Sequence, residues 1–285
     1  MTHKRFILLS FALLLAIELF AQSPYFRNKP LLKGQENYSV AQIFQDSLGY
    51  IWAATDKGLV KMINNQTTHY STQQGLASDV VTAINADRNG KLYVGHANGG
   101  VSLYADEAFK KLKRENLTIE EKISTFFFDE ANQPWIGTQG GGVYYLTPDS
   151  IYQYNSLSGL NDDYVYTITH GPDGAIWMGT DNGIAIYKDG RFRFITMKDG
   201  LPDNIVKKLI FDKKGTLWIG MEQGLASYNP ETGKFSSLGN WKWGTINTFV
   251  RMWPDELWVS TRQNGIARVT LKEDTTITRV YMKKD

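Results

Sequence analysis

The chain has 285 residues with 31 basic and 29 acidic side chains, and this near balance excludes a polycationic nucleic-acid binder and an acidic disordered tail. It contains no cysteine, which excludes disulfides, thiolate metal sites, iron–sulfur clusters and cysteine nucleophiles. Hydrophobic residues make up 42% and aromatic residues 13%, with 26 glycines, and this composition favours short strands joined by tight turns.

The first 21 residues have the features of a secretory signal peptide. Lys4 and Arg5 precede the apolar run 6–17, and the small residue Ala21 then offers a cleavage site. A membrane-spanning helix needs about 20 apolar residues, and Glu18 interrupts this run. An uncleaved anchor is the alternative. We expect cleavage after Ala21 and a mature protein in the periplasm or outside the cell.

The remainder of the sequence, residues 22–285, repeats one pattern six times. An aromatic residue flanked by aliphatic residues recurs every 40–42 residues, and a small residue follows it by two positions. A glycine follows by six or seven positions. The structural anchors of the repeat are Trp52, Tyr93, Trp135, Trp177, Trp218 and Trp258.

The copy that begins at residue 206 shows how a repeat resolves into four strands. Residues 206–211 are mostly apolar, as an inner strand requires, and turn residues separate the further strands 216–220, 225–228 and 234–238. Four antiparallel strands in about 41 residues is the size of one propeller blade. A solenoid of helical hairpins has a similar period, but the glycine content and the two-residue alternation argue against it.

The sequence therefore predicts an all-β protein, a β-propeller with six four-stranded blades. We expect the blades at residues 35–73, 76–115, 118–156, 160–197, 201–239 and 244–285.

The two ends of the repeat region suggest how the ring closes. Residues 24–33 align with the outermost strand of a blade, and residues 276–285 also have the pattern of an outermost strand. Six blades with one spare outer strand are expected to be the front part of a seven-bladed ring. The alternative is a six-bladed ring in which the spare strand lies across the seam.

The repeat resembles that of the two-component regulator propeller family. Residues 159–165 with 174–184, residues 200–206 with 215–220, and residues 75–81 carry this pattern. The resemblance implies the periplasmic sensor region of a hybrid histidine kinase, typical of Bacteroidetes that use complex polysaccharides. In that family a linker domain, a membrane helix and a kinase normally follow the propeller. Residues 170–177 carry a weaker resemblance to virginiamycin B lyase-type propellers.

No motif points to catalysis, a cofactor or a metal ion. Asp46, Asp87, Asp129 and Asp212 recur at one repeat position, so they fall on separate blades and are interpreted as turn-capping carboxylates. The glycines at 140–142 lack the lysine and helix of a phosphate-binding loop. Carboxylates in phase with the repeat, rather than one isolated pair, favour binding over glycan hydrolysis. A propeller enzyme, either a lyase or a glycan-active hydrolase, is the alternative.

The rim that carries the turns between second and third strands is the candidate ligand site. Threonine begins this turn in four copies, whereas His96 and Met221 replace it, and the indoles Trp241 and Trp243 occur in no other copy. Exposed indoles beside amides and an arginine suit a sugar, although both tryptophans could instead cover a seam between blades. The predicted ligand-binding residues are His96, Asn98, Asp181, Asn182, Glu222, Gln223, Trp241, Trp243 and Arg262.

These features together predict an extracytoplasmic, non-enzymatic sensor that binds a small molecule or an oligosaccharide. No nucleic-acid partner is expected. The signalling partner is expected to be a membrane histidine kinase or a C-terminal part of the same protein, and a homodimer is a further expectation.

Overall fold

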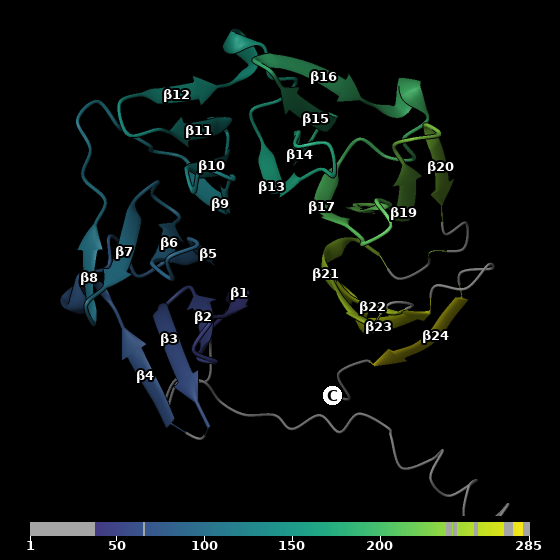
Figure 1. The fold of residues 1–285 in the computed structure, drawn as a ribbon. Coiled ribbons are helices and arrows are strands. Elements are labelled where there is room, and N and C mark those ends of the chain that lie inside the picture. The colour runs from purple at the N-terminus through teal and green to yellow at the C-terminus, as the bar shows by residue number, and fades with distance from the viewer. Residues whose placement is uncertain are drawn as a thin grey trace, which may run out of the picture. The chain divides into compact units, whose positions relative to one another are not determined.

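The computed structural model describes residues 38–64, 66–237, 241, 244–253, 256–270 and 276–281. Their strands form six antiparallel sheets, and each sheet contains four strands that are consecutive in the sequence. The sheets are blades arranged around a common centre, with the first strand of each blade innermost (Figure 1). The fold is therefore an all-β propeller with six blades, and this confirms the predicted fold class. The expected signal peptide and the spare strand at 24–33 lie outside the described residues.

The strands of the first three blades have the following bounds. Blade 1 contains β1 (Val40–Gln45), β2 (Ile51–Thr55), β3 (Gly58–Ile63) and β4 (Gln66–Tyr70). Blade 2 contains β5 (Val81–Ala86), β6 (Leu92–His96), β7 (Val101–Ala105) and β8 (Ala108–Lys111). Blade 3 contains β9 (Lys122–Phe128), β10 (Pro134–Gln139), β11 (Val143–Leu146) and β12 (Ile151–Tyr154).

The other three blades follow the same order. Blade 4 contains β13 (Val165–His170), β14 (Ile176–Thr180), β15 (Gly183–Lys188) and β16 (Arg191–Ile195). Blade 5 contains β17 (Val206–Phe211), β18 (Leu217–Met221), β19 (Gly224–Asn229) and β20 (Lys234–Ser237). Blade 6 contains β21 (Ile246–Trp253), β22 (Glu256–Thr261), β23 (Gly265–Thr270) and β24 (Thr276–Tyr281).

The recurring aspartate closes the turn between the first and second strands of a blade. Oδ1 of Asp212 accepts hydrogen bonds from the backbone N–H groups of Lys214 and Thr216, and its Oδ2 accepts one from the indole of Trp218 at 3.2 Å. Asp46 and Asp129 bind the anchor indoles of their own blades in the same way. The turn-capping interpretation is thus confirmed, and the carboxylate also orients the anchor.

Short 3-10 helices connect blades on the side of the outer strands. After β4, β12 and β16 the chain forms the helices η1 (Thr72–Gln74), η2 (Ser156–Ser158) and η3 (Met197–Asp199). Each helix ends at a glycine with φ between 96° and 100°, a left-handed conformation that favours this residue. The leucine that follows each glycine is buried, and this explains the Gly-Leu pair of the repeat.

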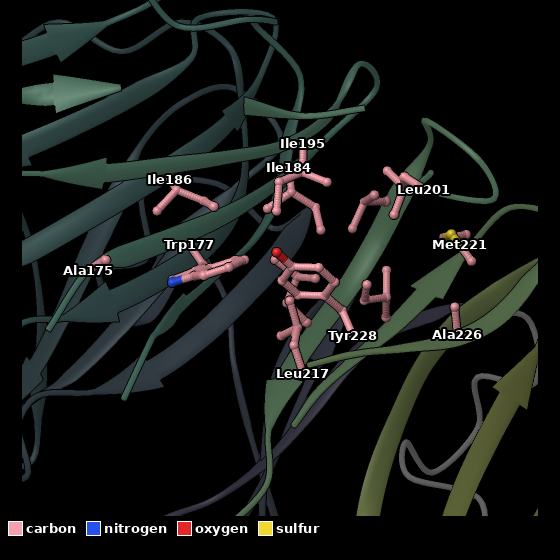
Figure 2. Packing of buried hydrophobic residues seen from close by; sticks show 13 residues of the cluster. Ala175, Trp177, Ile184, Ile186, Ile195, Leu201, Leu217, Met221, Ala226 and Tyr228 are labelled. Carbon is pink, nitrogen blue, oxygen red and sulfur yellow. The ribbon is translucent and has the colours of Figure 1, made fainter. Parts of the chain in front are cut away.

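The core is divided into clusters between consecutive blades. Between blades 4 and 5, Trp177 of β14 points toward Tyr228 of β19, with ring centroids 6.2 Å apart (Figure 2). Ile184 and Ile186 of β15 pack on the same cluster. The small residue two positions after an anchor makes room for the next blade, because a Cβ built on Gly179 would lie 2.7 Å from Val206. Adjacent blades therefore pack closely because the anchor indole fills the space between them and the small residue two positions later lets the next blade approach.

One face of blade 1 is exposed where the corresponding faces of the other blades are buried. Ile43 of β1 pairs with the residue after the anchor, and its side chain is 64% exposed. The equivalent residues of the other five blades are 1–7% exposed: Ile84, Phe126, Ile168, Leu209 and Phe249. Val250 of blade 6 is also exposed. The described residues thus leave aliphatic side chains uncovered at both ends of the blade series.

Candidate ligand-binding rim

Backbone hydrogen bonds join the turns between second and third strands to the loops that lead into the inner strands. The N–H of Glu222 donates to the carbonyl of Ile205 at 3.0 Å, and the N–H of Arg262 donates to that of Thr245 at 2.9 Å. The N–H of Gly183 donates to the carbonyl of Asn204, which leads into the following blade. These turns and loops therefore share one edge of the blades, which we call the axial rim.

The threonine that begins the turn in four blades is a buried structural residue. The hydroxyl of Thr180 donates to the carbonyl of Gly183 at 3.0 Å, and Thr55, Thr138 and Thr261 close their turns equivalently. His96 takes this place in blade 2, and its Nε2 lies 2.9 Å from the hydroxyl of Ser102. His96 and Met221 are both buried, so neither presents a side chain to a ligand. This corrects the interpretation of these two departures, and His96 does not belong to the candidate site.

Most of the other predicted residues reach the surface of the rim. Asn98, Asn182, Gln223 and Arg262 are exposed. Asp181 and Glu222 are half-buried. Their role in binding stays a prediction.

The additional tryptophan Trp241 lies between blades 5 and 6. Trp241 is half-buried, packs against the cluster between blades 5 and 6, and donates its indole N–H to the carbonyl of Gly244 at 2.7 Å. It also lies against Gly224, because a Cβ built on that glycine would be 3.3 Å from the Cβ of Trp241. Trp241 therefore contributes to the packing between blades 5 and 6. Trp243 lies outside the described residues.

Every inner strand carries a β-bulge at its rim end, and sequence patterns did not indicate it. At the rim end of each blade one residue is left without a partner in the pairing of the first and second strands. A bulge redirects the side chain and bends the strand. The bulged residues are Ala41, Thr82, Ser124, Tyr166, Lys207 and Asn247.

The bulges of blades 4 and 5 bring together a cluster of polar residues at the rim. The ammonium of Lys207 lies 3.3 Å from the ring centroid of Tyr166 and 3.5 Å from Oδ1 of Asp181. Burial raises the pKa of Tyr166, and its hydrogen bond to Asp181 raises it further. Burial lowers the pKa of Lys207, although the carboxylate of Asp181 opposes this shift. Both side chains are therefore desolvated and held in place.

Tyr166 and Lys207 were not among the predicted site residues, although the sequence contains a signal for them. Both follow an aliphatic residue that recurs at the start of each inner strand, and the residue at this next position varies from copy to copy. Tyr164, which precedes β13 and lies two residues before Tyr166, is also exposed. A variable position directly after a constant one would have marked the bulge.

Other features of the described residues lie away from the rim or carry no metal chemistry. Within the described part of the chain, no group of three histidine, aspartate or glutamate side chains is placed to hold a metal ion. One groove is lined by residues of the loop after β8 and of the outer strands of blade 3, including Arg114, Tyr144 and Gln153. Another hollow lies at the hairpin of β15 and β16. No described helix has the length and apolar character needed to cross a membrane.

Comparison with known proteins places the repeat and the fold. Residues 159–182 and 200–223 match the model of the family described as two component regulator propeller, which confirms the resemblance of the repeat. No curated protein sequence matches this chain significantly.

Solved structures share the fold at low identity. The extracellular domain of the proposed hybrid two-component system BT3049 from B. thetaiotaomicron is 22% identical, with a TM-score of 0.77 over 92% of this chain and 37% of that one. The corresponding domain of BT4673 from the same organism is 17% identical, with a TM-score of 0.75 over 89% and 38%. A catalytically inactive virginiamycin B lyase from Staphylococcus aureus with quinupristin is 16% identical, with a TM-score of 0.71 over 90% and 87%. This chain thus spans well under half of the length of these two extracellular domains.

Proposed function

We propose that this chain is the ligand-binding propeller of an extracytoplasmic signalling receptor and that it recognises a carbohydrate fragment on the axial rim. The matching repeats and the fold shared with extracellular sensor domains support the sensor role. The signal-peptide features of residues 1–21 support a location outside the cytoplasm. Signal output would then require a membrane histidine kinase, in the same protein or as a partner.

The contrast between the two edges of the blades carries the binding proposal. At the edge opposite the axial rim, three turns share one Asp-x-x-Gly pattern, at residues 46–49, 87–90 and 212–215, and in each of them the aspartate caps the turn. At the axial rim the exposed turn residues differ from blade to blade, although in each blade a backbone N–H at the turn donates to a carbonyl in a loop that leads into an inner strand. A scaffold that repeats its structure has no need of this variation, so the rim is the edge available for recognition.

Carbohydrate is the ligand class that the rim chemistry fits best. The amides of Asn98, Asn182 and Gln223 can donate and accept hydrogen bonds with hydroxyl groups. The exposed ring of Tyr164 offers an apolar face for the C–H groups of a sugar ring.

A glycan-array screen followed by titration calorimetry tests this proposal. Replacing Gln223 and Arg262 together with Ala should weaken the binding of any hit at least tenfold, which corresponds to about 1.4 kcal/mol. The matched control replaces Lys213 and Lys214, which lie in a turn at the opposite edge, and should bind normally. Equal affinity of the rim variant and the wild type would contradict the proposal.

The same hits distinguish a sensor from a propeller enzyme. A binding protein should return each oligosaccharide unchanged after long incubation, as measured by mass spectrometry. Cleavage with lyase or hydrolase products would instead support the alternative that the chain is an enzyme.

A further inference from the structure

Blades 4 and 5 differ from blades 2 and 3 in what their bulged residues do. The hydroxyl of Thr82 donates to the carbonyl of Ile123 at 2.7 Å, and the hydroxyl of Ser124 donates to the carbonyl of Val165. In both cases the bulged side chain links its blade to the next one. The longer side chains of Tyr166 and Lys207 instead contact each other at the rim. The Tyr166–Lys207 contact also joins two consecutive blades, but it does so between side chains, whereas in blades 2 and 3 the bulged hydroxyl binds the backbone of the next blade.

The positive charge of Lys207 is already balanced by its surroundings. Its ammonium lies between the carboxylate of Asp181 and the face of the Tyr166 ring. Only about a fifth of the Lys207 side chain is exposed, at 22%. An ammonium has three N–H donors, so donors remain for a hydroxyl group even when the charge is compensated.

Further carboxylates surround this sector. Asp203 and Glu222 act on Lys207 in addition to Asp181, and Asp162 acts on Tyr166. Asp203 is buried and accepts backbone hydrogen bonds from Ile205 and from Gln223, so it is fixed in position. Acidic groups therefore outnumber the ammonium, and an anionic ligand would meet repulsion here.

We infer, on the basis of the proposed function, that Tyr166 and Lys207 bind an uncharged saccharide and that the carboxylates around them exclude sulfated and carboxylated glycans. Lys207 donates to sugar hydroxyl groups, and Asp181 holds its ammonium in place. Exclusion follows from electrostatics, because like charges brought together at an interface are strongly disfavoured. The bulges of β13 and β17 aim both side chains at one place.

An array of equal-length oligosaccharides of different charge tests the inference. It contains cello-, xylo-, manno- and N-acetylchitohexaose as neutral probes, hexagalacturonate and a heparin hexasaccharide as anionic probes, and a chitosan hexamer as the cationic probe. We expect wild-type binding to at least one neutral probe and to neither anionic probe. Lys207→Met, which keeps the aliphatic stem, should weaken that binding at least tenfold in calorimetry. Tyr166→Phe provides a second, milder variant with the ring retained.

Two further variants keep the test specific. Lys188→Met removes an ammonium that pairs with Asp173 at 3.0 Å on the same blade, away from the rim turns, and should bind normally. Asp181→Asn removes the charge that balances Lys207, so we expect it to gain affinity for hexagalacturonate at least threefold. Melting temperatures confirm that each variant is folded.

The possible failures can be told apart. Binding of an anionic probe that is lost in Lys207→Met would overturn the inference and leave the sensor function standing, as would binding of the chitosan hexamer alone. Neutral binding that is unchanged in both Lys207→Met and Tyr166→Phe would also overturn it. The absence of binding to every probe would contradict the proposed carbohydrate function itself, and the inference with it.

Discussion

At the scale of single residues, one acidic position performs several structural tasks at once. Asp212 caps its turn, binds the indole of Trp218, and forms an ion pair at 3.0 Å with Arg251 of the next blade. Burial alone would raise the pKa of Asp212, but these hydrogen bonds outweigh it and lower the pKa. In blade 4 glycine replaces the aspartate, and the indole N–H of Trp177 has no hydrogen-bond partner. The repeat therefore tolerates the loss of this contact in one copy.

Removing the carboxylate of Asp212 should be costly. We expect Asp212→Ala to lower the free energy of unfolding by roughly 2–4 kcal/mol, because it leaves buried donors and the Arg251 charge without their acceptor. Asp87→Ala is the matched control, since Asp87 caps the backbone of Asn89 and Lys91 beside a tyrosine anchor. Its cost should be only about 1 kcal/mol. Urea unfolding measures both, and equal costs would contradict the role given to the indole and the arginine.

His96 should make blade 2 sensitive to acid. Burial lowers the pKa of His96 from 6.5 to about 4. Between these values the unfolded chain binds more protons than the folded chain, so the free energy of unfolding falls as the pH falls from 6.5 toward 4. The full contribution is on the order of 3 kcal/mol.

His96→Thr provides the direct comparison, because threonine closes this turn in four other blades. We expect its stability to depend less on pH between 6.5 and 4 than that of the wild type. Parallel pH profiles of the melting temperature would show that His96 is accessible to protons in the folded state.

At the scale of strands and blades, the sequence predicts regular features well and irregular ones poorly. Alternation, turn residues and the period of the anchors predict strands such as β17, because each reflects a local backbone or burial preference. The bulges were not predicted, since an additional residue in a strand changes no local preference and is visible only through its pairing. Strand direction correctly predicted that the turns between second and third strands share an edge with the loops between blades. The burial of His96 was not predicted, because a polar residue in a turn gives no sign of what covers it.

The small residue that follows each anchor should limit how closely blades approach. A Cβ built on Gly95 would lie 2.5 Å from Ile123 of the next blade, so Gly95→Ala requires blade 3 to shift. We expect a loss of roughly 1–3 kcal/mol in urea unfolding. Ser260 holds the equivalent position in blade 6, and Ser260→Ala should change stability by less than about 0.5 kcal/mol. A harmless Gly95→Ala would show that this interface is loosely packed.

At the scale of the whole molecule, the exposed face of blade 1 bears on how the ring closes. Ile43 is exposed at a position that is buried in the other five blades, in agreement with the expectation that the ring has room for a further blade. That expectation remains a prediction. The exposure of Ile43 has a direct consequence for stability: an aliphatic side chain in water contributes little to the free energy of unfolding, so replacing it should cost little.

Substituting the two equivalent isoleucines measures whether this face is open in solution. Ile84→Thr should lower the free energy of unfolding by roughly 2–4 kcal/mol, because it buries a hydroxyl and removes apolar contacts. Ile43→Thr should change it by less than about 0.5 kcal/mol. If Ile43→Thr lowered the free energy of unfolding as much as Ile84→Thr, this face of blade 1 would be covered in solution. The expectation that the ring has room for a further blade would then be wrong.

The central claim, that the axial rim recognises a carbohydrate, is tested most directly by a crystal structure of the protein grown with an oligosaccharide selected on the array. We predict sugar density at the rim of blades 4 and 5, with a hydroxyl group within hydrogen-bond distance of Lys207. Sugar bound instead in the groove beside Arg114 and Gln153, or at the edge of the Asp-x-x-Gly turns, would contradict this account.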